Sequence, residues 1–268
     1  GATQPGAVLE VGTAVGYSAI LMASVMPEHC RISTTEKYPP RVREARENFR
    51  RAGKEEQIQL IEGDAEDVLA RLAGPYDLIF MGGGADKEQS LLYQDLIKRK
   101  EQVQAALDSG SFILLICGGY QLFGKYYVDA FGNQIEGLGL FPYYTNAAAD
   151  NKRCIGNVLI EANLDGERVE VIGFENHGGQ SEGVTQPFGK VIIGHGNVFH
   201  GIYEGFYNGQ VLGTYLHGPL LPKNAKLADH ILKKALKKRY GEVTLAPLDD
   251  TWENKAFAAM KKRLIHAK

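Results

Sequence analysis

Cys117 and His217 are the two residues whose types and surroundings best fit nucleophilic chemistry. Cys117 follows an apolar run and precedes two glycines in "FILLICGGYQ". A strand that ends in such a turn exposes the thiol at the N-terminus of the next helix, where the helix field favours the reactive thiolate. His217 closes another apolar run, in "GTYLHGP". It can therefore supply the base that a nucleophilic thiol needs, although it is distant in sequence.

Both residues also have a purely structural interpretation. A cysteine after an apolar run is commonly a buried core residue, and a histidine beside a glycine can be satisfied by backbone groups. Because Cys117 and His217 both end apolar runs next to glycines, we favour the catalytic interpretation.

A second candidate site lies near the start of the chain. The stretch "LEVGTAVGYS" places Glu10, Gly12 and Gly16 around a predicted strand-to-helix turn. Glycines there let the backbone approach a ligand, and the helix offers unpaired N–H groups. Glu36 could accept hydrogen bonds from ribose hydroxyls, and Asp64 would lie near a base. Spacing alone favours the structural alternative, in which the glycines only serve a tight turn.

Alternating strands and helices must position these residues. The alternation predicts a doubly wound α/β fold, a flavodoxin-like or Rossmann-like hybrid whose mainly parallel sheet carries helices on both faces. Shorter, glycine-rich strands after about residue 137 predict antiparallel additions. Gly110 fits a left-handed helix cap, and Asp249 or Asp250 can cap the last helix. The predicted strands are 7–12, 31–37, 58–64, 76–81, 111–117, 154–162, 169–176, 189–196 and 209–218, and the predicted helices are 18–26, 40–53, 65–74, 95–110, 224–241 and 249–268.

Composition narrows the class of protein. The 268 residues are 44% hydrophobic and 23% charged with a net charge of −2, which predicts a globular chain with a sizeable core and no nucleic-acid footprint. We expect no signal peptide and no membrane span. The three cysteines, including Cys30 and Cys154, are widely spaced. This predicts a reducing, cytoplasmic setting without a disulfide framework or a metal site.

Residues 7–81 resemble the small, metal-dependent class I O-methyltransferases that use S-adenosylmethionine. The stretches "LEVGTAVGYSAILMA", "TTEKYPPRVREARENF", "IEGDAEDVLARL" and "PYDLIFM" match that family's first four strands in order. The resemblance implies a vestigial cofactor site at Glu10, Gly12, Gly16, Glu36 and Asp64. It fails at Gly82, where the family has a metal-binding Asp, and the later strands of the methyltransferase sheet do not follow. We therefore expect no methyl transfer.

Residues 77–242 resemble the class I glutamine amidotransferases of the cobyric-acid-synthase type, and within them the glutaminase subunits of lipid II isoglutaminyl synthases (GatD). The matching stretches are "DLIFMGGGADKEQS", "LLICGGYQLFGKYY", "GLGLFPYYT", "KRCIGNVLIE", "GFENHGG" and "GTYLHGPLLPKN". The resemblance implies that Cys117 attacks the carboxamide of L-glutamine. His217 would act as general base and then protonate the leaving ammonia. Backbone N–H groups of Gly83 and Gly118 would form the oxyanion hole.

The resemblance also implies residues that bind the substrate. Gln121 and Arg153 would hold L-glutamine, Arg153 as a fork for its carboxylate, and Asn176 and His177 would line the same pocket. Structural alternatives stay open. Arg153 could form a surface ion pair, Gln121 and Asn176 could serve turns or caps, and we favour a structural role over a role as base for His177.

The family's third catalytic residue is absent from the motif. Many class I amidotransferases have Glu two residues after the catalytic histidine, where this chain has Pro219. The sequence therefore predicts a Cys–His dyad that requires no cofactor. The resemblance implies an acidic partner from a Mur-ligase-like synthase subunit, which also receives the ammonia. We expect weak glutaminase activity for the isolated chain.

The two resemblances meet at Met81 and Gly82 without a linker. We therefore expect one composite α/β domain, an engineered or recombined chimera. Its parts would be a methyltransferase-like half at 1–81, an amidotransferase part at 82–242 and a helical tail at 243–268. The starting "GATQPG" fits a cut end. The alternative is a catalytically silent scaffold that retains S-adenosylmethionine binding.

Overall fold

The fold is described from a computed structural model, over residues 7–63, 68, 76–83, 93–94, 96–148 and 152–266. The contacts divide the chain into two compact units. The first comprises Gly1–Gly82, Gln94–Leu114 and Leu232–Leu245, and the second comprises Gly83–Tyr93, Leu115–Ile231 and Ala246–Lys268. The expectation of one composite domain stays a prediction.

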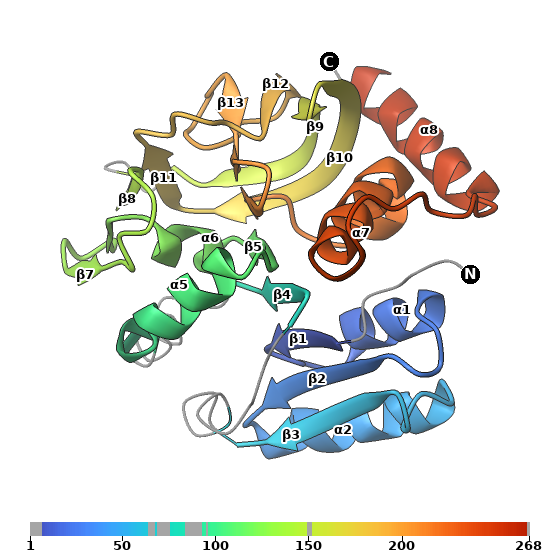
Figure 1. Ribbon diagram of the computed structural model, residues 1–268. Helices are drawn as coiled ribbons and strands as arrows, with labels where there is room; N and C mark the ends of the chain where they lie inside the picture. The colour runs from blue at the N-terminus through green and yellow to red at the C-terminus, as the bar shows by residue number, and fades with distance from the viewer. Residues whose placement is uncertain are drawn as a thin grey trace. The chain divides into compact units, whose positions relative to one another are not determined.

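The first unit is built on parallel strands, which run from blue at β1 to teal at β4 in Figure 1. Strand β1 pairs in parallel with β2 on one side and with β4 on the other, and β2 pairs in parallel with β3. The strand order continues from β4 to β5. These strands are β1 (Ala7–Val11), β2 (Arg31–Glu36), β3 (Ile58–Glu62), β4 (Leu78–Met81) and β5 (Phe112–Ile116). The predicted mainly parallel α/β sheet is confirmed.

Helices α1 (Tyr17–Val25), α2 (Pro39–Arg51) and α5 (Lys100–Asp108) connect these strands. The buried face of α2 carries Val42, Ala45 and Phe49, a spacing that places apolar residues on one side of a helix. Gly110 follows α5 with φ +84°, which confirms the predicted left-handed cap.

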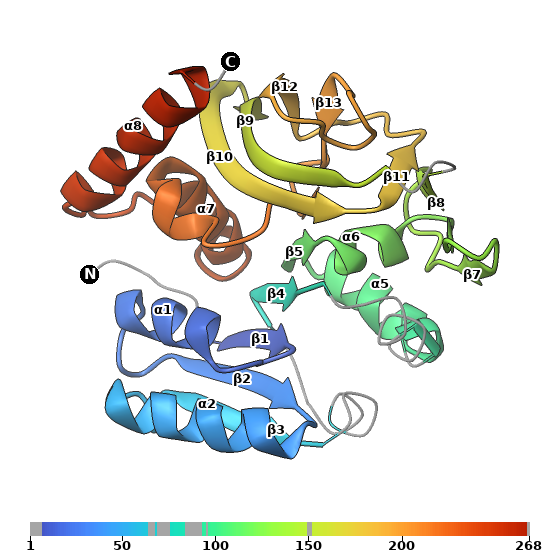
Figure 2. The same cartoon turned by 180° about the vertical axis from the view of Figure 1, so that it is seen from behind.

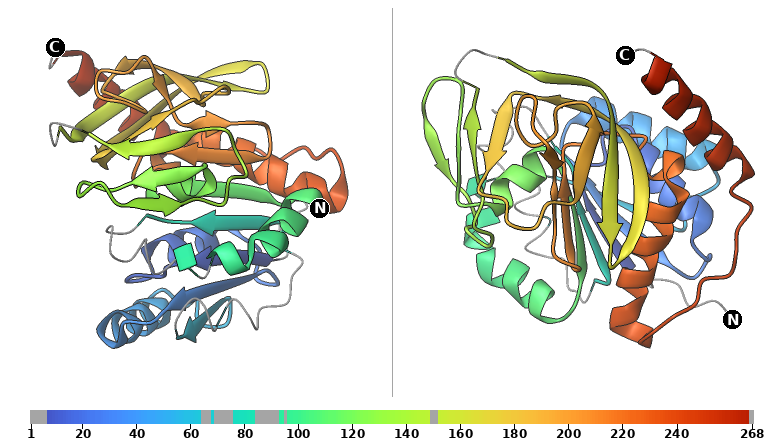
Figure 3. Two further views of the ribbon diagram at one scale, coloured as in Figure 1. Left: turned by 90° about the vertical axis from the view of Figure 1, so that its left-hand side faces the viewer. Right: turned by 90° about the horizontal axis from the view of Figure 1, so that it is seen from above.

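The second unit contains the antiparallel strands, seen from two further sides in Figures 2 and 3. Strands β9 and β10 form a long antiparallel hairpin that joins Cys154 to His177 in register. Its turn holds Asp165 and Gly166, both with positive φ, as tight hairpin turns require. The predicted antiparallel additions are therefore confirmed.

Two four-stranded sheets and a pair of strands beside β5 make up the β-structure of this unit. The sheet orders are β10-β9-β12-β13 and β11-β8-β6-β7, and β15 lies between β5 and β14. The strands are β6 (Tyr126–Val128), β7 (Gln134–Glu136), β8 (Tyr144–Ala147), β9 (Cys154–Leu164), β10 (Glu167–His177), β11 (Gly179–Glu182), β12 (Gly189–Ile193), β13 (Tyr203–Glu204), β14 (Phe206–Tyr207) and β15 (Val211–Thr214).

The C-terminal part is helical, as predicted. It contains a 3₁₀ turn at Leu221–Lys223 and helices α7 (Ala225–Tyr240) and α8 (Thr251–His266). Asp249 accepts a hydrogen bond from the Thr251 N–H at 3.1 Å, at the start of α8.

Helix α8 packs on the long hairpin through Leu264, which clusters with buried Leu159 and Ile172. None of the helices in the described part of the chain has the length and apolar character that a membrane crossing requires.

Candidate functional site

Cys117 occupies a sharp turn between β5 and helix α6 (Gly118–Phe123). Its φ of 53° and ψ of −107° form a strained combination for a residue with a side chain, and such strain persists only where the surroundings impose it. The Cys117 N–H donates to the Thr214 carbonyl at 2.8 Å, and its own carbonyl accepts from the Gln121 N–H at 3.0 Å. The side chain is half-buried. This geometry is that of a nucleophile elbow.

The two glycines predicted for the oxyanion hole lie beside this elbow. A Cβ on Gly83 would be 2.9 Å from the Cys117 Cβ and 3.3 Å from the Gly118 nitrogen. Gly118 is the first residue of α6, so its N–H has no acceptor within the helix. The positions suit an oxyanion hole, and that role stays a prediction.

His217 lies next to strand β10. Its N–H donates to the Phe174 carbonyl at 2.7 Å, and the two residues form an isolated antiparallel bridge. The Nε2 atom of His217 is buried and has no hydrogen-bond partner among the described residues. Burial lowers the pKa of His217. A neutral imidazole with an unpaired nitrogen is what a general base requires.

A stacked aromatic pair connects the surroundings of Cys117 and His217. The rings of His177 and Tyr215 lie 3.6 Å apart and nearly parallel, at 6°. Burial, and to a smaller extent the charge of neighbouring His217, lowers the pKa of His177 to about 4. Burial also raises the pKa of Tyr215, and the charge of Cys117 adds to this effect. Both predicted catalytic side chains are therefore electrostatic neighbours of this pair.

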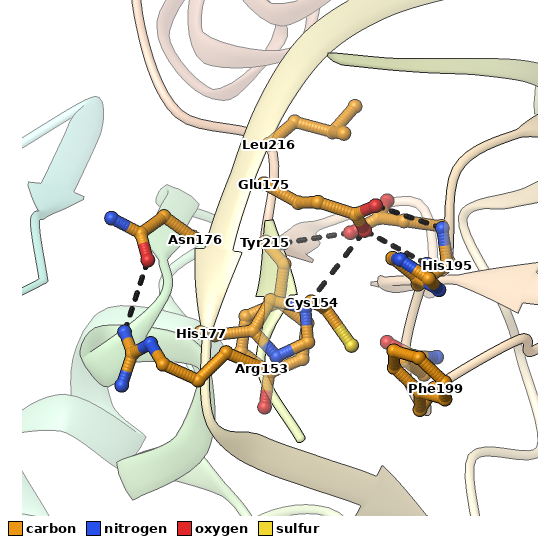
Figure 4. A network of polar contacts seen from close by, with 12 residues as sticks. Arg153, Cys154, Glu175, Asn176, His177, His195, Phe199, Tyr215 and Leu216 are labelled. Atoms are coloured by element: carbon orange, nitrogen blue, oxygen red, sulfur yellow. Dashed lines mark hydrogen bonds and ion pairs between the residues drawn. The ribbon is translucent and has the colours of Figure 1, made fainter. Parts of the chain in front are cut away.

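His177 is held inside the protein, as Figure 4 shows. Its Nδ1 bonds to the Gly179 carbonyl at 2.7 Å, so this nitrogen carries the proton. Its Nε2 lies 4.0 Å from the carboxylate of Glu175, which also accepts the N–H groups of His195 at 2.8 Å and Gly196 at 2.9 Å. Burial raises the pKa of Glu175. The arrangement favours a structural role for His177.

Arg153 and Asn176 contact each other on the exposed side of the hairpin. The guanidinium of Arg153 donates to the Asn176 side-chain oxygen at 3.0 Å (Figure 4). This bond orients a guanidinium whose remaining donors can form a fork for a carboxylate. The structure therefore brings two predicted substrate-binding residues together, and their contact with a substrate stays a prediction.

Gln121 has an internal partner. Its side chain is 3% exposed and donates to the Tyr215 hydroxyl at 3.1 Å. A Cβ on Gly179 would lie 2.4 Å from the Gln121 Nε2, so only glycine leaves room for this amide. The geometry favours a role in holding the elbow over direct substrate binding.

Sequence reasoning missed Tyr215, Glu175 and Glu204. The first two lie two residues before His217 and His177. Glu175 and His177 belong to β10, where residues two apart share one face of the strand. That spacing was the available signal. Glu204 is buried and accepts the Tyr215 N–H at 2.7 Å, and burial raises its pKa to about 8. No local pattern marks Glu204, because its partners are distant in sequence.

In the first unit, Glu10 is committed to internal hydrogen bonds. Its side chain is buried, and it accepts hydrogen bonds from the hydroxyls of Ser18 and, at 2.5 Å, Thr34. Glu10 therefore links the start of α1 to β2 beneath the glycine-rich turn. Its contact with a cofactor stays a prediction.

The other predicted cofactor residues surround that turn. Gly12 and Gly16 have φ of 98° and 87°, and a Cβ on Gly16 would lie 2.4 Å from the Phe49 ring. Glu36 accepts the Ala14 N–H at 3.0 Å. These contacts support the structural explanation of Gly16. Over Gly12 there is open space, because no other part of the described chain lies within 4 Å of a Cβ placed there. Asp64 lies outside the described residues.

A cysteine at a sharp turn beside Gly83, and a histidine distant in sequence that has the same ring pair as an electrostatic neighbour, are the arrangement expected for a class I glutamine amidotransferase. Residues 48–225 match the CobB/CobQ-like glutamine amidotransferase domain family, well over half of the chain. The chain belongs to this family. The match begins before residue 77, the predicted start of the amidotransferase resemblance, and overlaps the methyltransferase-like stretch.

Two relatives are glutaminase subunits of the GatD type. The chain is 40% identical over 163 residues to the subunit GatD of the glutamine-hydrolysing lipid II isoglutaminyl synthase of Staphylococcus aureus, covering 61% of this chain and 65% of the relative. It is 43% identical over 169 residues to GatD of Streptococcus pneumoniae, covering 62% and 64%. The chain thus spans less than two thirds of the length of these relatives.

A third relative belongs to the other class. The chain is 40% identical over 94 residues to a catechol O-methyltransferase of Mycobacterium tuberculosis, covering 35% of this chain and 42% of the relative. The predicted two-part resemblance is therefore confirmed.

Proposed function

We propose that this chain hydrolyses the side-chain amide of L-glutamine. The observation that carries the proposal is the strained Cys117 elbow, with the backbone of Gly83 and Gly118 beside it. The buried Nε2 of His217, which has no hydrogen-bond partner among the described residues, supports it.

In the first half of the reaction, the Cys117 sulfur attacks the carboxamide carbon, and His217 takes the thiol proton. The N–H groups of Gly83 and Gly118 stabilise the negative oxygen that forms. His217 then passes its proton to the leaving nitrogen, the C–N bond breaks and ammonia departs. In the second half, His217 takes a proton from water, which attacks the thioester. Glutamate leaves and the Cys117 thiol is restored.

Arg153 supplies the recognition of the substrate in this proposal. Its guanidinium, oriented by Asn176 at 3.0 Å, would bind the α-carboxylate of L-glutamine through paired hydrogen bonds. Because this carboxylate lies at the far end of the substrate from the carboxamide, Arg153 would fix the distance between the bound end and Cys117.

The ammonia would pass to a partner. The two GatD relatives are subunits of lipid II isoglutaminyl synthases, and this supports a cytoplasmic role in cell-wall precursor amidation with a Mur-ligase-like synthase subunit. Pro219 stands where many class I amidotransferases carry Glu. The acidic partner of His217 would therefore come from that subunit. Without it, the glutaminase activity of the isolated chain is weak.

The pH profile of ammonia release tests this proposal. Burial lowers the pKa of His217 below its ordinary value of 6.5, and the base must be neutral to act. As the pH falls from 8, release of ammonia from L-glutamine should stay constant through pH 6.5 and decline only below it. His200→Gln changes an exposed histidine and should leave the profile unaltered. A decline that begins above pH 6.5, or folded protein that releases no ammonia at any pH, would contradict the proposal.

The chain would also be a chimera of two protein families. The match to an amidotransferase family over residues 48–225 and the 94-residue match to a methyltransferase support two lineages in one chain. The alternative function is then a catalytically silent scaffold, in which recombination at Met81 and Gly82 has removed the surface that docks the partner subunit. Folded protein without ammonia release would favour that alternative.

A second candidate function is binding of S-adenosylmethionine by the first unit. The open space over Gly12 favours it, because a ligand can approach the backbone there. Calorimetric titration with S-adenosylhomocysteine should give heat that Gly12→Ala reduces, because the added methyl group occupies that space. Wild-type protein that gives no heat at millimolar ligand would exclude this function.

A further inference from the structure

One short segment, Thr214–His217, contacts the nucleophile elbow at two points and ends in the predicted base. The Thr214 carbonyl accepts the Cys117 N–H at 2.8 Å. The Tyr215 hydroxyl accepts a hydrogen bond from Gln121 at 3.1 Å, and Gln121 is in turn bonded through its N–H to the Cys117 carbonyl. The segment therefore holds the residues on both sides of the strained Cys117.

We infer that Tyr215 is a positioning residue that fixes the Cys117 elbow relative to His217. This inference rests on the proposed glutaminase function. Tyr215 would not touch the substrate. It would act through Gln121 on one side and through the backbone of its own segment on the other.

The Tyr215 hydroxyl has a defined place in a buried chain of polar groups. It shares a hydrogen bond with the Ser181 hydroxyl at 2.7 Å, and Ser181 shares another with Thr145 at 2.7 Å. Gln121 donates to this hydroxyl, and in the bond with Ser181 either hydroxyl can be the donor. When Tyr215 donates to Ser181, its hydroxyl uses both its acceptor and its donor capacity. A satisfied buried network of this kind fixes the positions of its members.

The ring and backbone of Tyr215 are restrained as well. The ring is fully buried and stacks on His177 at 3.6 Å. The backbone N–H donates to the Glu204 carboxylate at 2.7 Å, and the same oxygen accepts the Thr214 hydroxyl at 2.9 Å. These contacts hold the segment Thr214–His217 against β10 and β13. The Tyr215 hydroxyl is therefore fixed in position, and it fixes the Gln121 side chain in turn.

The contacts of Tyr215 matter because the backbone at Cys117 is strained. A residue with a side chain at φ 53° and ψ −107° relaxes to an ordinary conformation unless its neighbours prevent it. Loss of the Tyr215 hydroxyl leaves the Gln121 amide without its partner and frees the first turn of α6. The thiol would then drift from its position relative to His217.

Tyr215→Phe tests the inference, because it keeps the ring and removes only the hydroxyl. We expect kcat for ammonia release to fall about tenfold, as for the loss of one positioning hydrogen bond, while KM stays within about twofold. Tyr207→Phe is the control away from the elbow. The half-buried Tyr207 bonds through its hydroxyl to the Asp165 carboxylate at 3.1 Å and to the His230 ring at 2.6 Å, in the β9–β10 turn and in α7. Both variants should lower the urea midpoint, but Tyr207→Phe should keep kcat.

A double-mutant cycle tests whether Tyr215 acts on the Cys117 elbow through the Gln121 amide. If Tyr215 acts through that amide, Tyr215→Phe combined with Gln121→Met should lower kcat no further than the worse single variant. Multiplied effects, or equal kcat losses in Tyr215→Phe and Tyr207→Phe, would overturn the inference.

Alkylation of Cys117 by iodoacetamide separates this inference from the proposed function. The reaction needs no turnover. Peptide mass spectrometry identifies the alkylated cysteine, and Cys30 and Cys154 should react slowly because they are buried. We expect Tyr215→Phe to slow alkylation by about threefold or more as the elbow relaxes, and Tyr207→Phe to leave it unchanged. An unchanged rate in Tyr215→Phe would overturn the inference. Wild-type protein without ammonia release would defeat only the proposed function.

Discussion

Cys117→Ala should reduce ammonia release from L-glutamine to the uncatalysed level, a loss of about 10⁴-fold or more. The substitution removes the sulfur that forms the thioester, and water cannot use the elbow in its place. The fold should survive, because the side chain is half-buried and alanine keeps the backbone bonds to Thr214 and Gln121. Ammonia and glutamate should be measured together, so that one molecule of each per turnover identifies the reaction.

Cys30→Ala provides the matched control for Cys117→Ala. Cys30 is fully buried and belongs to the first unit, and burial raises the pKa of its thiol, which makes it a poor nucleophile. The control should keep the wild-type rate. Cys117→Ala protein that retains a substantial part of the rate would exclude Cys117 as the nucleophile.

Gly83→Ala is expected to lower kcat by about a hundredfold or more. The new methyl group would lie 2.9 Å from the Cys117 Cβ, closer than such carbons approach each other. Either the loop or the elbow must therefore move, and the Gly83 N–H leaves its place beside the nucleophile. Loss of one oxyanion donor costs about 10²–10³ in kcat in other acyl-transfer enzymes.

Gly82→Ala is an adjacent control with the same change in composition. Among the described residues, a Cβ on Gly82 would meet only the Phe80 ring, at 3.8 Å, and neither glycine has a φ in the left-handed region. Gly82→Ala should therefore keep kcat, and both variants should unfold at similar urea concentrations. If the two variants lose activity equally, the oxyanion assignment to Gly83 is wrong.

The sequence by itself determined the local structure around the two candidate catalytic residues, Cys117 and His217. Apolar runs and glycine turns predicted strands β1 to β5, the cap at Gly110 and the antiparallel hairpin. The pattern around Cys117 predicted a sharp turn, which the φ of 53° now describes. These features were predictable because they depend on residues a few positions apart, whose periodicity and turn chemistry a sequence displays directly.

Only the tertiary structure decided which polar residues work together. Gln121 and Tyr215 are 94 positions apart and yet share a hydrogen bond. Sheet pairing sets such contacts, as when the bridge between Phe174 and His217 places a β10 residue beside the predicted base. The same pairing buried Glu204 against the Tyr215 N–H. Strand register and burial arise from the packing of the whole chain, so no local pattern predicts them.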